Sequence, residues 1–288
     1  MIAVWKRELK SFFDDMLGYF IVAAFLMLIG YFFSEYNIEN PYAFFAYPIC
    51  AVSTFMSALI PLLTMRSFSE ERKSKTDQLL LTAPVSVWKI TMGKYLAMVS
   101  VFAIPVLISC VYPIVIYVTG SYAYPLTDYT TILAFFLVGA SYIAIGMFFS
   151  SLTESQIIAA LLAFAFMFIL GNLRSLATKV PMEEWKNAVI LILFTVVFFV
   201  IFFKMTQNFY VSFAVFAVLC IGVAVAYHLN PDMFYGVVGQ IMRAVSYGET
   251  LYLFANNIFD VTSIVLYLSV SAFFIFLTIQ SIQKRRYS

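Results

Sequence analysis

The stretch YTTILAFFLVGASYIAIGMFFSSLT, residues 129–153, contains no Asp, Glu, Lys, Arg or His. A helix that crosses the hydrocarbon core of a bilayer needs about 20 predominantly apolar residues. The hydrocarbon offers no partner for backbone N–H and C=O groups, so a spanning segment must satisfy them internally, as a helix does. The run therefore predicts a transmembrane helix.

The rest of the chain repeats this pattern. Of its 288 residues, 63% are hydrophobic and 11% are charged, whereas a soluble protein has roughly 25% charged residues. We expect a polytopic all-α membrane protein forming a single domain over residues 1–288, with about eight spans: a six-span core plus an extra helical hairpin at 187–228. The other charge-free apolar runs are 16–33, 42–65, 95–119, 155–173, 187–203, 205–227 and 261–283.

The basic residues predict the orientation, because Lys and Arg in short loops stay on the cytoplasmic side. With eight spans and both termini in the cytoplasm, only Arg174, Lys179, Lys186 and Arg243 of the 17 Lys and Arg residues fall on the outer side. We therefore place both ends in the cytoplasm and expect the chain in a bacterial cytoplasmic membrane.

Two segments are neither spans nor simple loops. Residues 1–15 place Trp5, Leu9 and Phe12 at helical spacing with basic residues elsewhere, which predicts an amphipathic elbow helix in the membrane interface. A plain anchor before the first span is the alternative. Residues 230–260 mix glycines and charges with apolar residues, and we expect two short interfacial or re-entrant helices on the outer side, or else an ordinary loop.

The longest cytoplasmic loop, residues 66–94, carries the functional prediction. Ser69 is a candidate N-cap, and Glu70 and Glu71 would lie in a first turn, where the helix dipole favours negative charge. Leu79 to Leu81 make the other end apolar before Pro84 stops the helix. We expect a helix over 69–81 that packs on a soluble partner.

This loop resembles the one between spans two and three of ABC-2 type permeases, through Ser-Glu-Glu-Arg at 69–72, Thr-Asp-Gln-Leu-Leu at 76–80, Ala-Pro-Val-Ser at 83–86 and Gly-Lys at 93–94. Ser-Leu-Thr-Glu-Ser-Gln at 151–156 resembles the next cytoplasmic loop in the branch that includes gliding-motility permeases. The resemblance covers spans one to five and the last span with its outer re-entrant segment. The hairpin is additional to the family's six spans.

The resemblance implies an exporter in which two permease subunits form the pathway, and in which the helix after span two docks on a separate cytoplasmic ATPase. Many family members have glycine at the position of Lys75. By position, the residues implied to contact the ATPase are Glu70, Glu71, Arg72, Lys75, Thr76, Asp77 and Gln78, and those of the second cytoplasmic loop are Thr153, Glu154 and Gln156.

The sequence lacks the residues that other classes of function require. No Gly-x-x-x-x-Gly-Lys-Ser/Thr loop is present, so ATP and Mg²⁺ are expected on the partner ATPase, and this chain is expected to be no enzyme. His228 stands alone and the three cysteines are dispersed, which predicts no metal site and packed thiols. A net charge of +2 indicates no nucleic-acid partner.

The predicted spans carry no carboxylates, which disfavours an ion-coupled carrier. Asp128, Glu154 and Asp260 are expected to be interfacial charges at the ends of spans. One alternative stays open: the chain could be a membrane anchor that couples a cytoplasmic ATPase to an extracytoplasmic accessory protein without moving a solute.

Overall fold

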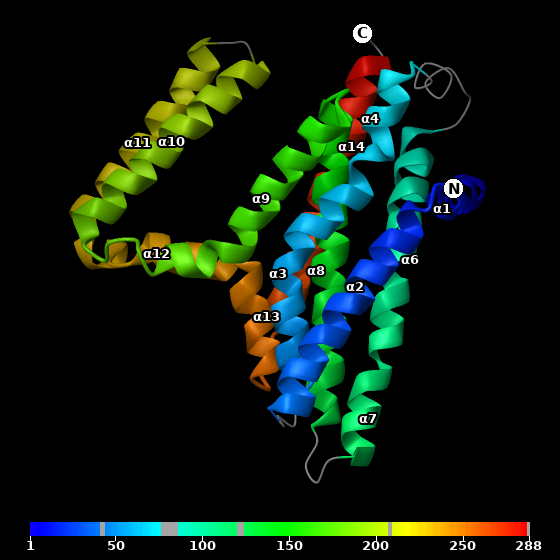
Figure 1. Cartoon of the computed structure of the whole chain (residues 1–288). Helices are drawn as coiled ribbons and strands as arrows, with labels where there is room; N and C mark the ends of the chain where they lie inside the picture. The colour runs from blue at the N-terminus through cyan, green and yellow to red at the C-terminus, as the bar shows by residue number, and fades with distance from the viewer. Residues whose placement is uncertain (41–43, 76–85, 120–123, 207–208, 287–288) are drawn as a thin grey trace. The chain divides into compact units, whose positions relative to one another are not determined.

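The computed structural model describes residues 1–40, 44–75, 86–119, 124–206 and 209–286, and the regular structure in these ranges is helical (Figure 1). Seven helices in the described part are long and apolar enough to cross a membrane. The chain is therefore a polytopic all-α membrane protein, as the sequence predicts. The elements are α1 (Ile2–Asp14), α2 (Leu17–Phe33), η1 (Ser34–Glu39), α3 (Ala46–Thr64), α4 (Arg66–Lys73), α6 (Val87–Ser109), α7 (Val111–Thr119), α8 (Pro125–Leu152), α9 (Gln156–Ala177), α10 (Glu184–Thr206), α11 (Phe209–Leu229), η2 (Pro231–Phe234), α12 (Val237–Val245), α13 (Tyr247–Ala255) and α14 (Val261–Arg286).

In the described residues, each predicted apolar run is mainly helix. The run at 95–119 is divided into α6 and α7 at Cys110, because Pro113 has no N–H to donate to the carbonyl of Ser109 one turn earlier. The helix at run 187–203 is α10, which is not among the seven; that count covers only the described residues. The number of eight spans and the orientation of the termini stay predictions.

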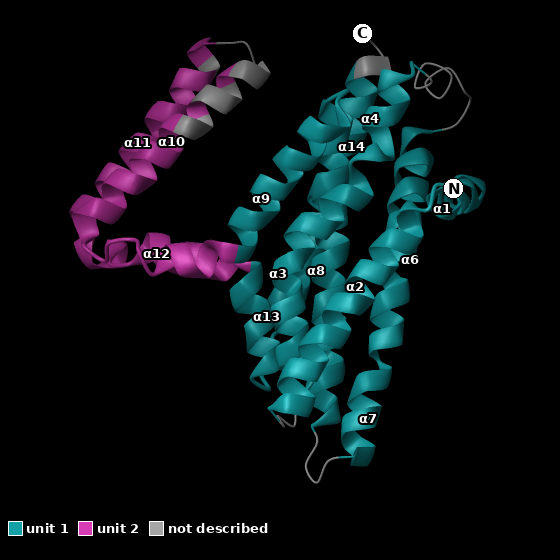
Figure 2. Cartoon of the chain, viewed as in Figure 1, with its two compact units in different colours: residues 1–171, 247–288 teal, residues 172–246 magenta. Residues whose placement is uncertain are grey.

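The chain divides into two compact units (Figure 2). Unit 1 comprises residues 1–171 and 247–288, and unit 2 comprises residues 172–246. The boundary cuts the outer segment 230–260, so that η2 and α12 belong to unit 2 and α13 belongs to unit 1. The expected single domain is thus built from two units, and each is described by itself below.

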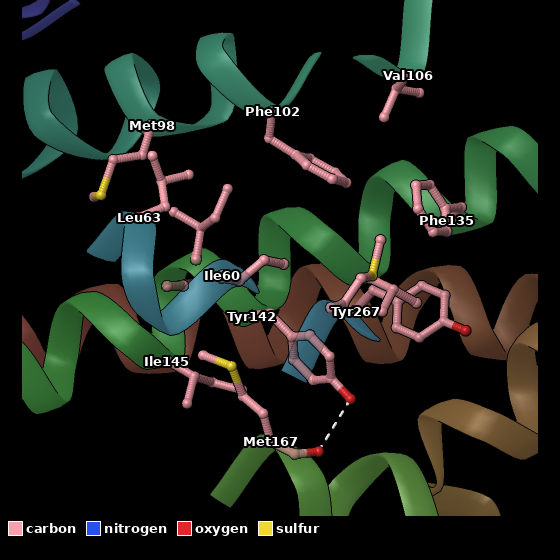
Figure 3. Close-up of a cluster of buried hydrophobic side chains, with 14 of the residues drawn as sticks. Ile60, Leu63, Met98, Phe102, Val106, Phe135, Tyr142, Ile145, Met167 and Tyr267 are labelled. Carbon is pink, nitrogen blue, oxygen red and sulfur yellow. Dashed lines mark hydrogen bonds between the residues drawn. The ribbon is translucent and has the colours of Figure 1, made fainter. Parts of the chain in front are cut away.

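Helix α8 is the centre of unit 1. It packs against α3, α6, α13 and α14, and 72% of its apolar window is buried. Figure 3 shows part of this core, where Ile60 of α3 and Phe102 of α6 are fully buried and the Tyr142 hydroxyl of α8 donates to the carbonyl of Met167 at 3.2 Å. Lipid tails are as apolar as these side chains, so close packing and internal hydrogen bonds hold the helices together.

Small residues on α8 allow this packing. A Cβ atom built on Gly146 would overlap the Thr64 side chain of α3, and one built on Gly139 would overlap the Phe102 ring of α6. Both glycines therefore mark places where a neighbouring helix approaches the backbone of α8 too closely for any larger residue.

Carboxylates cap two helices of unit 1. Asp128 is 1% exposed, and its Oδ1 accepts hydrogen bonds from the backbone N–H groups of Phe45 and Ala46, at the start of α3, at 2.8 and 3.0 Å. The expectation of an interfacial charge is wrong for Asp128, because α8 begins at Pro125 and carries the carboxylate inside. Asp260 is half-buried and accepts from the N–H groups of Thr262 and Ser263 at the start of α14.

Unit 2 is built around the helical hairpin of α10 and α11. Asn187, which is fully buried, joins α10 to its surroundings: its Nδ2 donates to the Pro181 carbonyl at 2.9 Å and its Oδ1 accepts from the N–H of Val238 in α12 at 3.3 Å. Only 6% of the apolar window of α11 is buried. Most of α11 therefore presents apolar side chains to the surroundings of the chain.

Candidate functional site

The predicted functional loop begins as a direct extension of the second span. Helix α4 follows α3 with only Met65 between them, and the two form one candidate span, Ala46–Lys73. The expectation that Ser69 is the N-cap is wrong: Ser69 is fully buried within α4, and its hydroxyl donates back to the carbonyl of Met65. Glu70 and Glu71 consequently lie past the first turn, contrary to expectation.

The start of α4 is capped instead by a serine from another helix. The Oγ of Ser150, near the end of α8, accepts from the N–H groups of Phe68 and Ser69 at 3.1 and 3.2 Å and donates to the Met65 carbonyl at 3.0 Å. A fully buried hydroxyl thus satisfies backbone groups at the α3–α4 junction. This bridge fixes α4 to the central helix of unit 1.

A buried lysine joins three helices at the same end of unit 1. The side chain of Lys94, on α6, is 3% exposed. Its Nζ donates to Glu71 Oε1 of α4 at 2.9 Å, to the Ser67 carbonyl of α4 at 2.8 Å and to Glu8 Oε2 of α1 at 3.3 Å. An ammonium group has three N–H bonds, and the three acceptors take all of them. We call Lys94, Glu8 and Glu71 the lysine node.

The helical extension of α6 explains why this lysine is internal. Lys94 precedes the apolar run 95–119, so the sequence places it at the edge of the membrane, but α6 already begins at Val87 and carries Lys94 into its second turn. The Nζ also lies 5.2 Å from the centre of the Phe68 ring, a favourable cation–π distance.

Helix α1 is packed on α6, as the elbow prediction requires of its apolar face. The Trp5 Nε1–H donates to Ser100 Oγ at 3.0 Å, and a Cβ built on Gly93 would lie 2.9 Å from Val4. Leu9 and Phe12 are half-buried and pack against the hydrophobic core of unit 1. The position of α1 along the membrane surface stays a prediction.

The predicted ATPase-contacting residues fall into two groups. Glu71 points into the lysine node, and Arg72 donates to the Ser151 carbonyl at 3.2 Å and to Glu154 at 3.3 Å, with only 15% of its side chain exposed. Glu70 is 54% exposed beside Arg66. Glu70 is therefore open to a partner, whereas Glu71 and Arg72 hold α4 to its own chain.

Helix α4 ends in a conformation that suits glycine. Lys75 follows the C-cap Ser74 with φ of 55°, in the left-handed region that few residues other than glycine enter without strain. A glycine at this position would take the same conformation without strain. Thr76, Asp77 and Gln78 lie outside the described residues, as does the rest of the predicted helix up to Leu81.

The second cytoplasmic loop closes the arrangement. Thr153 ends α8, and its Oγ1 accepts from the N–H of Ser155 at 3.0 Å, which turns the chain toward α9. Glu154 pairs with Arg72, so this loop is tied to α4, while Gln156 is half-buried at the start of α9. The sequence gives no sign of the Arg72–Glu154 contact between the two loops.

Sequence reasoning missed the residues that fix α4. Glu8 reads as one charge among several on an amphipathic helix, and Ser150 as a small polar residue in a span. The only available signal was Gly93-Lys94 itself, a cation preceded by a residue small enough to admit another backbone. Among the described residues, no group of three or more His, Cys, Asp and Glu side chains could hold a metal ion.

Comparison with known proteins gives one family. The family model described as "ABC-2 family transporter protein" matches residues 6–180, which include α4, most of α1 and the three residues of the lysine node. No curated protein matches the chain.

Proposed function

The chain belongs to the ABC-2 transporter family, and we propose that it is the permease subunit of an exporter driven by a separate cytoplasmic ATPase. Membership of this family makes the chain a membrane component rather than an ATPase. In the proposed assembly, two permease subunits in a bacterial cytoplasmic membrane form the pathway, and ATP and Mg²⁺ bind to the ATPase. The gliding-motility branch is part of the proposal and rests on residues 151–156 alone.

We infer that α4 receives the force. Its exposed residues, Glu70 and Lys75, lead into residues 76–78, which resemble the family's ATPase-docking segment. The observation that supports this role is the lysine node. A contact that only tethered an ATPase would need no buried links to the spans, whereas α4 is bonded to α6 and α1 through Lys94 and to α8 through Ser150.

These links transmit displacement because breaking them costs free energy, so the linked helices move together. Separating Lys94 from Glu71 leaves buried charges without a partner, at a cost of about 3–5 kcal/mol when one member is removed. Close-packed helices likewise move as units between discrete arrangements. A push on the free end of α4 is thus passed to three other helices of unit 1.

The two adjacent glutamates allow a sharp test. Glu70→Lys changes the exposed face, and we expect weaker co-purification of the ATPase with the permease. Glu71→Gln alters the lysine node, and we expect normal co-purification but ATP hydrolysis that no longer responds to the permease. Both measurements use the full chain in reconstituted membranes, with membrane insertion as the control.

Two results would contradict the proposal. Normal ATPase binding and normal stimulation in both variants would mean that the contact lies elsewhere. Loss of binding in Glu71→Gln together with normal binding in Glu70→Lys would reverse the assignment of the two faces. If hydrolysis is coupled to work on an extracytoplasmic protein and no solute crosses, the chain serves as a mechanical anchor instead of an exporter.

A further inference from the structure

Two contacts fix the rotation of α1 about its own axis. Val4 lies against Gly93, whereas Trp5 is bonded to Ser100. Gly93 and Ser100 are about 10 Å apart along α6, at a rise of 1.5 Å per residue. In the proposed topology, Ser100 lies deeper in the bilayer than Gly93. The Val4 side of α1 therefore faces the cytoplasm, and the Trp5 side faces the hydrocarbon.

The remaining directions follow from the helical repeat of about 100° per residue. Ile2, Leu9 and Phe13 lie nearer to Trp5 than to Val4 around the helix and so continue the deep side. Val4, Trp5 and Glu8 all face α6. Lys6 and Lys10, four residues apart on one face, point away from α6 and thus sideways along the plane of the membrane interface.

These two lysines differ from the other cations of this region. Arg7 is paired with Glu8 at 2.7 Å, and Lys94 is held by Glu8 and Glu71. Lys6 and Lys10 are exposed, and among the described residues no carboxylate comes within 4.0 Å of either ammonium group. Their charge is therefore available to a ligand outside the chain.

We propose that Lys6 and Lys10 bind the phosphate of an anionic phospholipid in the cytoplasmic leaflet. Side chains at i and i+4 are about 5–6 Å apart at Cβ, close enough for both to reach one phosphate. Ile2, at 65% exposure, adjoins Lys6 on the deep side, where acyl chains would lie while the lysine stems extend to the headgroup, and the half-buried Phe13 adjoins Lys10. These apolar neighbours favour a lipid over a soluble phosphate. The inference rests on the topology of the proposed function.

The test uses the full chain in nanodiscs of phosphatidylcholine that contain a trace of fluorescent phosphatidylglycerol. Energy transfer to a label on the chain reports the lipid's local enrichment. We expect Lys6→Gln/Lys10→Gln to lower the apparent affinity for phosphatidylglycerol by roughly tenfold or more. A single basic residue near an anionic membrane surface raises the affinity by somewhat less than about tenfold, and this variant removes two of them. Lys6→Arg/Lys10→Arg should keep the affinity.

The matched control is Lys73→Gln/Lys75→Gln, which removes the same charge from exposed positions at the far end of α4. The inference is overturned if this control loses as much affinity as Lys6→Gln/Lys10→Gln, or if neither variant loses any. It is also overturned if millimolar inorganic phosphate displaces the lipid, because the site would then take a soluble anion. ATPase coupling is measured separately: intact coupling without phosphatidylglycerol enrichment at the unaltered chain removes only this inference, and enrichment without coupling removes only the proposed function.

Discussion

Helices α8 and α11 are both long, apolar and free of Lys, Arg and Glu, yet they differ in how much of each is buried inside the protein. In α8 72% of the apolar window is buried inside the protein, and in α11 only 6% is. Gly146 of α8 lies against the Thr64 side chain, whereas a Cβ on Gly222 of α11 would meet nothing within 4 Å. Hydropathy locates a span but does not distinguish a helix packed against protein from one facing its surroundings.

The polar contacts of the two regions differ in the same way. Around α8, hydrogen bonds join distant segments, as Ser150 does for Met65 and Phe68. In the α10–α11 hairpin, the Thr195 hydroxyl donates to the carbonyl of Ile192 in its own helix, and its contact across the hairpin is with the weakly hydrogen-bonding Sγ of Cys220 at 3.4 Å. Contacts between elements resist relative movement, whereas contacts within one helix only support that helix. We propose that force is transmitted through unit 1, where contacts between elements join α4 to α1, α6 and α8.

The largest expected difference between the regions comes from removing one lysine in each. Lys94→Met removes the buried ammonium group from Glu71 and the Ser67 carbonyl, while Glu8 keeps Arg7, and we expect it to destabilise unit 1 by about 3–5 kcal/mol. Lys186→Met breaks only the exposed pair with Glu183, worth about 0–1 kcal/mol. Unfolding in mixed micelles with increasing denaturing detergent measures both. Equal losses would mean that the node is solvated.

A smaller difference in stability is expected from replacing Gly146 of α8 and Gly222 of α11. Gly146→Val forces the Thr64 side chain and α3 away from α8, and overpacking of this kind costs about 1–3 kcal/mol. Gly222→Val enters open space on α11 and should leave stability unchanged to within about 0.5 kcal/mol. The same micelle titration compares them. Strong destabilisation by Gly222→Val would show that α11 packs closely against a partner in the membrane.

The smallest expected difference in stability is between removing the hydroxyl of Ser150 in unit 1 and removing that of Thr195 in unit 2. Ser150→Ala removes the cap of α4, and we expect a loss of about 1–2 kcal/mol together with faster hydrogen exchange at the N–H groups of Phe68 and Ser69. Thr195→Val removes a bond within α10 and a weak contact with Cys220 Sγ, and it should cost less than about 1 kcal/mol, with exchange at α4 unaltered. Unchanged protection of α4 in Ser150→Ala would show that α4 is stable without α8.

Of the candidate site, the sequence identified the segment but not its internal geometry. The resemblance of residues 66–94 placed α4 correctly after span two, and the helical spacing of Trp5, Leu9 and Phe12 predicted α1. Ser69 was misassigned because a helix that continues from a span needs no local cap. Glu70 and Glu71 are equivalent as neighbours in sequence, and only packing against α6 makes one of them exposed and the other internal.

By itself, the sequence determined that the chain lies in a membrane, where its helices run and which family it belongs to. The membrane location and the helices depend on composition, length and local pattern, and they are set within about 20 residues by the need to satisfy the backbone in lipid. The family follows from residues 6–180. Only the tertiary structure decided which helix is central and which charges are buried. Lys94 and Glu8 are 86 positions apart, and Ser150 and Phe68 are 82 apart. Such contacts depend on how whole helices pack, which no local pattern in an apolar sequence specifies.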